Sequence, residues 1–367
     1  MNIHKFRSPS LSKRPELLMN RNMPNLRFWM DNARKIALPQ SAIPCLTAII
    51  LSIGQDGFFW PLAIPVFLGV CAAHLGMNLA DDYFDYLKGL PSGEIRSSLV
   101  AEGSVRARMD KCQYILSGAA TEKDLRKAMI LFLGFAALMG LAVVIFQMLT
   151  NGPASALAVA AYAFAGLFIG LQYSGAPMRL GYHGLGELVI GVVFGPLNMM
   201  GAAAAVTGAA FRPDMFILSI GIGCLVTNIV FVHSVMEAAA DKQLGKRTFA
   251  HLLGGKTSQI TALAVFTLVP FICLICNVFL YGWSHWYLLT LVSLPLSVCF
   301  LCSTWRFINN LPCDDTPRWW MGSMGNWNEY VKAGVDWFLF RWLMARNINT
   351  FFCLVVIIVF IINSIVK

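Results

Sequence analysis

Charges are missing from long stretches of this chain, and this feature limits its fold more than any other. Seven blocks of at least 20 residues contain no Asp, Glu, Lys or Arg. Each is long enough for a membrane span, because a helix needs about 20 apolar residues to cross a bilayer. A soluble domain is not expected, since 57% of the residues are hydrophobic and only 13% are charged. The charge-free blocks are residues 36–55, 57–80, 128–178, 188–211, 215–236, 257–305 and 347–366.

Two of these blocks are long enough for two crossings each. Turn residues interrupt the first at 150–153 and the second at 281–285. Together with the five single blocks they predict nine transmembrane helices, the pattern of an all-α polytopic membrane protein. Barrel strands are not expected, because the spans show no alternating polarity. The predicted organisation is a basic interfacial segment at 1–35, a core of eight spans at 36–305, a Trp-rich cytoplasmic interfacial loop at 306–348 and a ninth span at 349–367.

The distribution of Lys and Arg predicts how the chain is oriented. If the N-terminus is cytoplasmic, nine spans place 26 of the 28 basic residues on the inner side, as the positive-inside rule requires. We therefore expect an inner (plasma) membrane protein with a cytoplasmic N-terminus and an outer C-terminus. The net charge of +9 is explained by this topology and by anionic lipid, so a nucleic-acid partner is not expected.

Three carboxylates and an amide are concentrated where the second span ends. At about 100° per residue, His74, Asn78, Asp81, Asp82 and Asp85 share one arc of a helix. Like charges this close repel each other and need a cation. Mg²⁺ favours such hard oxygen ligands and completes its shell with water and phosphate oxygens, so the face predicts a site for a Mg²⁺-bound diphosphate. The alternative is a solvated helix end, which explains neither the clustering nor the polar residues inside the apolar span.

A second acidic face follows the sixth span. His233, Glu237 and Asp241 are four residues apart, which places them on one side of a continuous helix. Cations follow at once, and a departing diphosphate needs such cations as its charge increases. A plain positive-inside loop is the alternative for this cluster. The basic residues are Lys242, Lys246 and Arg247.

A glycine-rich segment links the fourth and fifth spans. Its glycines and Pro177 specify a tight loop between Tyr173 and Glu187. Arg179 is a candidate phosphate ligand in this loop. Glu187 either orients a substrate hydroxyl or is a helix-start acid favoured by the helix dipole.

These three segments resemble the UbiA superfamily of intramembrane aromatic prenyltransferases over roughly residues 35–300. The likeness lies in Asn78-x-x-Asp81-Asp82-x-x-Asp85, in Glu237-x-x-x-Asp241 and in the loop from Tyr173 to Glu187. Within the superfamily the chain is most similar to the 1,4-dihydroxy-2-naphthoate polyprenyltransferase branch of menaquinone synthesis. Two departures stand out: Glu237 replaces the usual Asp, and Gly89 replaces an acid of the 4-hydroxybenzoate branch, which disfavours that acceptor.

The resemblance implies nine helices around a central cavity, with Mg²⁺ and a polyprenyl diphosphate held by the two acidic motifs. It assigns metal binding to Asn78, Asp81, Asp82, Asp85, Glu237 and Asp241, among which Asp82, Asp85 and Asp241 are the expected catalytic residues. We expect diphosphate contacts from Lys242, Lys246, Arg247 and Arg179, and substrate contacts from His74, Tyr173, Glu187 and His233.

The predicted function is therefore Mg²⁺-dependent transfer of a polyprenyl group to an aromatic acceptor, here 1,4-dihydroxy-2-naphthoate. His74, His233 and Glu187 are the candidates for the group that takes the acceptor's proton. No obligate protein partner is inferred. One alternative is a prenyltransferase of the same superfamily with another aromatic or lipid acceptor. The other is a secondary transporter, which intramembrane acids also suggest but which requires polar residues near the midplane of several spans.

Overall fold

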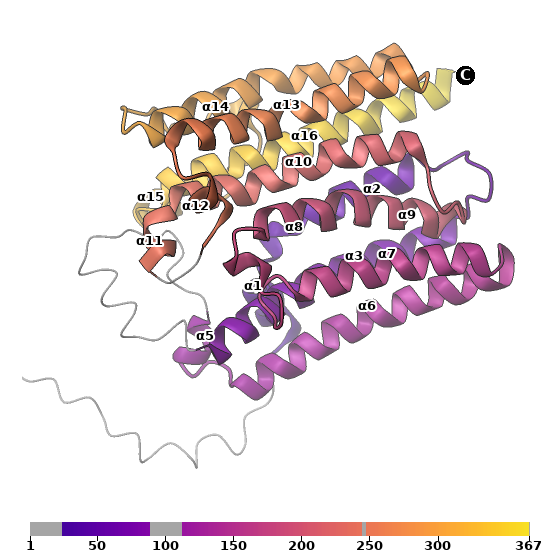
Figure 1. The fold of residues 1–367 in the computed structure, drawn as a ribbon, viewed down its shortest axis with the longest axis horizontal. Helices are drawn as coiled ribbons and strands as arrows, with labels where there is room; N and C mark the ends of the chain where they lie inside the picture. The colour runs from indigo at the N-terminus through magenta and orange to yellow at the C-terminus, as the bar shows by residue number, and fades with distance from the viewer. Residues whose placement is uncertain (1–23, 89–111, 244–246, 367) are drawn as a thin grey trace, which may run out of the picture.

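The computed structural model describes residues 24–88, 112–243 and 247–366 as a bundle of long helices (Figure 1). Within these residues, eight helical segments are long and apolar enough to cross a membrane. They are η4 (Trp60–Leu62) with α3 (Ala63–Leu87), α6 (Glu122–Thr150), α7 (Pro153–Leu171), α8 (Gly186–Val192) with η6 (Val193–Leu197) and α9 (Asn198–Thr207), α10 (Pro213–Met236), α13 (Lys256–Leu280), η7 (His285–Ser293) with α14 (Leu294–Ile308), and α16 (Asp336–Val366). The predicted fold class, an all-α polytopic membrane protein, is confirmed.

The first predicted span is the shortest apolar element. Residues Lys35–Ile50 form η3 (Lys35–Ala37) and α2 (Pro39–Ile50), so the helix ends before the predicted boundary at residue 55. Gly54 adopts a left-handed φ of 80° in the turn that follows, where a residue without a side chain is favoured. With this shorter helix as the first crossing, the count agrees with the nine predicted spans.

Both predicted interruptions of the double-length blocks are present. α6 ends at Thr150 and α7 begins at Pro153, where proline suits the first turn because its missing N–H has no partner there. α13 ends at Leu280, and η7 begins at His285. The turn residues of the sequence therefore locate both helix breaks correctly.

The fifth span contains a π-helical turn, η6, between α8 and α9. Pro196 lies inside this turn and has no N–H to donate to the preceding turn. The turn packs tightly on α10: a Cβ on Gly195 would approach the Gly223 Cα and the Ser219 carbonyl oxygen to 2.5 Å. Such π-turns are frequent at functional sites, and this one supplies Phe194 to the cavity described below.

The last helix begins earlier than the charge pattern predicted. α16 starts at Asp336 and includes part of the segment that was predicted as a loop up to residue 348. The predicted block without charge begins after Arg346, but Arg341 and Arg346 both lie inside α16. The side chain of Arg341 is 0% exposed and is neutralised inside the protein. Both of its terminal nitrogens lie 3.0 Å from the carboxylate of Asp315. Before α16, the segment forms η8 (Trp319–Met321) and α15 (Trp327–Lys332).

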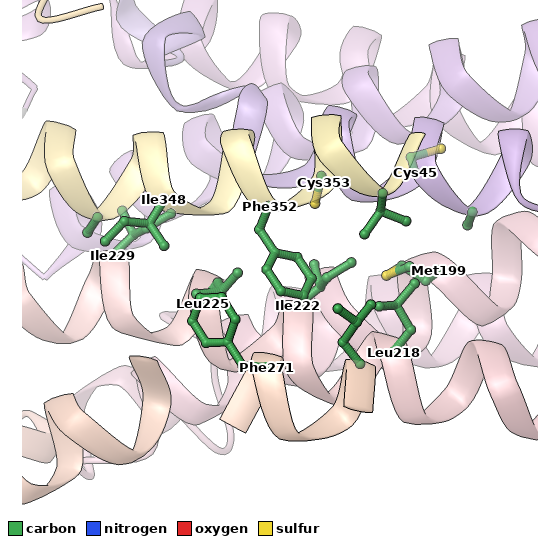
Figure 2. Packing of buried hydrophobic residues seen from close by; sticks show 14 of the residues in the cluster. Cys45, Met199, Leu218, Ile222, Leu225, Ile229, Phe271, Ile348, Phe352 and Cys353 are labelled. Carbon is green, nitrogen blue, oxygen red and sulfur yellow. The ribbon is translucent and has the colours of Figure 1, made fainter. Parts of the chain in front are cut away.

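α10 is the centre of the hydrophobic core. Leu218, Ile222, Leu225 and Ile229 follow each other along one side of this helix and are buried. Figure 2 shows them between α16, which contributes Ile348, Phe352 and Cys353, and α13, which contributes Phe271. The three-and-four spacing of the α10 residues matches the helical repeat, so one apolar stripe holds two neighbouring helices.

The short helices gather at one end of the bundle (Figure 1). They are α1 (Leu26–Asn32), α5 (Gln113–Leu116), α11 (Ala238–Gln243), α12 (Phe249–Leu253) and α15. α1 lies in the segment predicted to be interfacial, but its Trp29 is buried and packs edge-on against Tyr114 of α5. The C-terminal end of α16 lies at the opposite end of the bundle, as an odd number of crossings requires.

Candidate active site

The first acidic face lies on the last turns of α3. Asp82 and Asp85 are only 2% and 1% exposed, although both are carboxylic acids. A buried charge is costly unless it is paired and hydrogen-bonded. The groups around these acids therefore define what the site can hold.

Arg34 is the cation that faces this cluster. Its Nη1 donates to Oδ2 of Asp81 across 3.1 Å, and its Nη2 donates to Oδ1 of Asp82. Burial lowers the pKa of Arg34, but the Asp82 and Asp81 carboxylates outweigh that effect and the net pKa is raised. Arg34 precedes η3 and adopts a left-handed φ of 63°, a conformation that is uncommon for a residue with a side chain.

Hydroxyl groups from three other segments also donate to the α3 acids. Ser174 donates to Oδ1 of Asp81, Tyr114 donates to Oδ2 of Asp82 across 3.1 Å, and Tyr182 donates to Oδ1 of Asp85. Burial, followed by the adjacent carboxylate, raises the pKa of Tyr114 and that of Tyr182. Both phenols therefore remain donors at neutral pH. Lys88 lies 3.3 Å above the ring of Tyr182.

Asn78 has a partner that the sequence did not reveal. Its Nδ2 donates to the backbone carbonyl of Ala33 across 2.8 Å. This bond holds the residue before Arg34 against α3. In this structure the amide therefore fixes the position of the Arg34 backbone, and its Oδ1 is the atom suited to a metal ion.

The second acidic face is bent rather than straight. α10 ends at Met236, Glu237 departs from helical geometry with φ −102° and ψ 12°, and α11 begins at Ala238. His233 and Glu237 do share a face, with Nε2 and Oε2 2.9 Å apart. Asp241 lies in α11, but the Asp241 N–H still donates to the Glu237 carbonyl across 2.9 Å, and the Glu237 N–H donates to the His233 carbonyl across 3.0 Å. The shared face of the three residues stays a prediction. Asp241 is nevertheless buried.

Tyr173 lies between the two acidic faces. Burial raises its pKa first, and the carboxylates of Asp81, Glu187, Asp85 and Asp241 raise it further. The glycine-rich loop closes around its ring: a Cβ on Gly181 or Gly186 would approach ring atoms to 3.2 and 2.8 Å. The small residues of this loop are therefore required for the position of Tyr173.

One cavity of about 430 Å³ joins these elements. Seven of the predicted site residues line it, together with apolar and aromatic side chains that include Phe194 and Trp342. The seven are His74, Asn78, Asp81, Asp82, Tyr173, His233 and Glu237. Asp85 and Asp241 are buried but are not part of the cavity lining.

The basic residues that were predicted to contact the diphosphate are not part of the cavity lining in the described part of the chain. Arg179, Lys242 and Arg247 have exposed side chains, and Lys246 lies outside the described residues. A backbone bridge between His183 and Arg247 brings the loop after α7 beside the segment after α11. Arg179 and Arg247 thus come from two segments that meet at the cavity end of the bundle.

Glu187 caps a helix. Its Oε1 and Oε2 accept from the Phe249 N–H across 3.1 and 3.2 Å, at the first residue of α12. Its carboxylate is buried and is not part of the cavity lining. Glu187 also lies in the first turn of its own helix α8, and its contact with a substrate hydroxyl stays a prediction.

The carboxylate and amide oxygens of this site suit a hard cation. Mg²⁺ uses one or two carboxylates and fills the rest of its shell with water and substrate phosphates. Asp81 and Asp82 already accommodate a cation, the Arg34 guanidinium, between them. Across residues 24–88, 112–243 and 247–366, no three His, Cys, Asp or Glu side chains are arranged as a complete metal centre. The acids therefore fit Mg²⁺ as partial ligands of a metal–substrate complex.

Arg34, Ser174, Tyr114 and Tyr182 are site residues that the sequence reasoning missed. Hydroxyl groups have no characteristic spacing, so their role depends on tertiary contacts. Arg34 had a usable signal, because it is a basic residue immediately before the first span of a chain whose acids need a cation.

The fold and this cavity define a polytopic membrane enzyme with a charged cavity end. A sequence profile of the UbiA prenyltransferase family matches residues 41–322. The chain belongs to this family and is a prenyltransferase, which transfers alkyl groups other than methyl. This membership removes the secondary transporter alternative.

Relatives of known activity cover most of the chain. The 1,4-dihydroxy-2-naphthoate octaprenyltransferase of Mycobacterium tuberculosis is 25% identical over 75% of this chain and 85% of its own. The enzyme of the same name from Bacillus subtilis is 24% identical over 72% and 78%. A 2-carboxy-1,4-naphthoquinone phytyltransferase from Synechocystis is 33% identical over 36% of this chain and 42% of its own.

Solved structures agree on the fold. A UbiA homologue from Aeropyrum pernix has a TM-score of 0.54 and 15% identity, covering 93% of this chain and 99% of its own. A homologue from Archaeoglobus fulgidus, bound to DMAPP and Mg²⁺, has a TM-score of 0.53 and 14% identity, covering 87% and 98%.

Proposed function

We propose that this prenyltransferase transfers a polyprenyl group from its allylic diphosphate to 1,4-dihydroxy-2-naphthoate, with Mg²⁺, in menaquinone biosynthesis. One observation carries the proposal: a single cavity in the membrane bundle has carboxylates of both acidic motifs and apolar and aromatic side chains in its lining. The charged groups suit a diphosphate and its metal, and the apolar groups suit a prenyl chain and an aromatic ring.

The charged end of the cavity holds the groups for ionisation of the allylic diphosphate. Mg²⁺, when bound, neutralises the diphosphate and makes it a better leaving group. Asn78, Asp81, Asp82 and Glu237 line the cavity with the oxygen atoms that would hold it, and Asp85 and Asp241 lie buried beside them. Arg34 is close enough to these acids to contact the same diphosphate.

Water exclusion is the second requirement. The allylic C–O bond breaks with its electron pair going to the diphosphate, and the cation that remains would be captured by any water in the cavity. Phe194 and Trp342 are among the side chains that line the cavity. These residues leave the aromatic ring of the acceptor as the available nucleophile.

The acceptor is inferred from the relatives. Several enzymes that match most of this chain bear the name 1,4-dihydroxy-2-naphthoate octaprenyltransferase. The ring carbon that bears the carboxylate attacks the prenyl cation, and that carbon then loses carbon dioxide. Other aromatic or lipid acceptors are the alternative within the same superfamily.

The side of the membrane on which the reaction takes place follows from the distribution of basic residues. We infer that the cavity end of the bundle faces the cytoplasm of an inner (plasma) membrane, because the basic residues are concentrated there by the positive-inside rule. Lys242, Lys246, Arg247 and Arg179 would then attract the anionic donor from the cytoplasm.

The test is an assay of the purified protein in lipid with radiolabelled farnesyl diphosphate, Mg²⁺ and 1,4-dihydroxy-2-naphthoate. We expect a lipid-extractable prenylated naphthol and one carbon dioxide per product. Mg²⁺-dependent donor binding without any such product would show that the acceptor is wrong. Loss of donor binding as well, in folded protein, would refute the whole assignment.

A further inference from the structure

The sequence leaves three candidates for the residue that takes the acceptor's proton, and their contacts in the structure differ. Glu187 is committed to the start of α12. His233 points its Nε2 at Glu237, 2.9 Å away, and its ring packs edge-on against Phe338. Only His74 lines the cavity without being committed to an acid or a helix end.

Ser41 contacts the Nδ1 side of the His74 ring. The hydroxyl of Ser41 donates its single proton to the carbonyl of Leu38 across 3.3 Å. The same oxygen lies 2.6 Å from Nδ1 of His74, and in the tautomer with the proton on Nδ1 the imidazole donates to this oxygen. Nε2 is then an unprotonated acceptor, and it has no hydrogen-bond partner among the residues that the structure describes.

The surrounding residues hold the imidazole rigidly. Asn198 of α9 donates to the backbone carbonyl of Ser41 across 2.9 Å, which ties α9 to α2. Phe194 of the π-turn packs on the His74 ring, with centroids 4.7 Å apart and planes at 35°. Phe194 also lines the cavity and offers a flat apolar surface beside the imidazole ring.

We propose that His74 takes the hydroxyl proton of the aromatic acceptor through Nε2 and later returns it. The proposal rests on the function proposed above. As the ring carbon bonds to the prenyl cation, the neighbouring C–OH becomes C=O and its proton moves to Nε2. When the carboxylate leaves as carbon dioxide, the electron pair of the broken C–C bond returns to the ring, and His74 gives the proton back to the oxygen. No net proton is consumed.

Gln40 is a companion in this role. It precedes Ser41 in α2, lines the same cavity and has no side-chain hydrogen bond within the described part of the chain. Its amide can therefore hold a second oxygen of the acceptor while His74 handles the proton.

The experiment compares wild type with His74→Gln and His74→Ala in lipid. General acid–base groups contribute about 10²- to 10⁴-fold, so we expect prenyl transfer by His74→Gln to fall at least 100-fold. Mg²⁺-dependent binding of farnesyl diphosphate should be unchanged. Added imidazole should restore transfer to His74→Ala in proportion to its concentration, which a merely structural role would not produce. His285→Gln, at an exposed histidine where η7 begins, is the matched control and should behave as wild type.

Two results would overturn this role in an active wild-type enzyme: transfer by His74→Gln within twofold of wild type, or no imidazole effect in folded His74→Ala that binds donor. A wild-type protein that binds donor but never prenylates the naphthoate would instead overturn the proposed acceptor and the role of His74 with it.

Discussion

Nη1 of Arg34 lies 3.1 Å from Oδ2 of Asp81, which joins the residue that precedes the first membrane helix to the acidic end of the next. The second terminal nitrogen of Arg34 pairs with Asp82. A cation from the protein itself thus lies at the carboxylates for which we propose a metal–diphosphate complex. Substrate binding must therefore redistribute these charges.

Replacing Arg34 by Ala should destabilise the metal-free protein by about 3 kcal/mol, because it removes a cation that pairs with two poorly exposed carboxylates. Mg²⁺ should then stabilise Arg34→Ala more than it stabilises wild type, which the thermal midpoint in detergent measures with and without the ion. Arg27→Ala, at an exposed arginine in the preceding helix α1, is the control. An identical response to Mg²⁺ in Arg34→Ala and wild type would show that Arg34 and the metal do not share the acids.

Metal removal should abolish transfer without unfolding the protein. EDTA withdraws the cation needed by the leaving diphosphate, whereas Arg34 still neutralises Asp81 and Asp82. We expect activity to fall by on the order of 100-fold or more, to return with added Mg²⁺, and the thermal midpoint to change little. Asp82→Asn should remain inactive at any Mg²⁺ concentration, while Asp56→Asn, at an exposed turn, should retain activity. Full transfer in EDTA would exclude a metal role.

The buried pair between Arg341 and Asp315 should be a major contribution to the stability of the C-terminal region. Arg341 also lies 4.7 Å from the ring of Phe307, so Asp315→Asn leaves an uncompensated charge among apolar groups. Breaking such a pair costs about 3–5 kcal/mol. The exposed pair of Arg318 and Asp314 is the matched control, and Asp314→Asn should leave the midpoint unchanged. Equal midpoints for both variants would contradict this reasoning.

The contact between the π-turn and α10 should not tolerate a methyl group. Gly195→Ala would place Cβ 2.5 Å from the Cα of Gly223, and such overpacking costs about 1–3 kcal/mol. Gly134→Ala, in α6, meets nothing within 4 Å and should be neutral or stabilising, since alanine favours helices by about 1 kcal/mol. Thermal unfolding of the two variants in detergent measures the difference. A Gly195→Ala protein as stable as Gly134→Ala would show that the turn relaxes freely.

Much of the fold was readable from the sequence. The blocks without charge located the membrane helices, and the turn residues at 150–153 and 281–285 located two breaks. The start of α16 was misjudged because the charge rule began the span after Arg346, although Arg341 and Arg346 both lie inside the helix. Their partners are far away in the sequence: Asp315 for Arg341 and the Ser323 carbonyl for Arg346.

The candidate site also has a part that the sequence determined and a part that only the tertiary structure decided. The sequence by itself determined the acidic residues and their helical spacing, because spacing along a helix is a local property. Tertiary structure decided that Asp241 belongs to a separate helix, that Glu187 caps α12, and that Arg34 pairs with the α3 acids. It also decided the roles of Ser41, Phe194 and Asn198 around His74. These contacts join residues far apart in the chain, so they depend on how the helices pack and not on any local pattern.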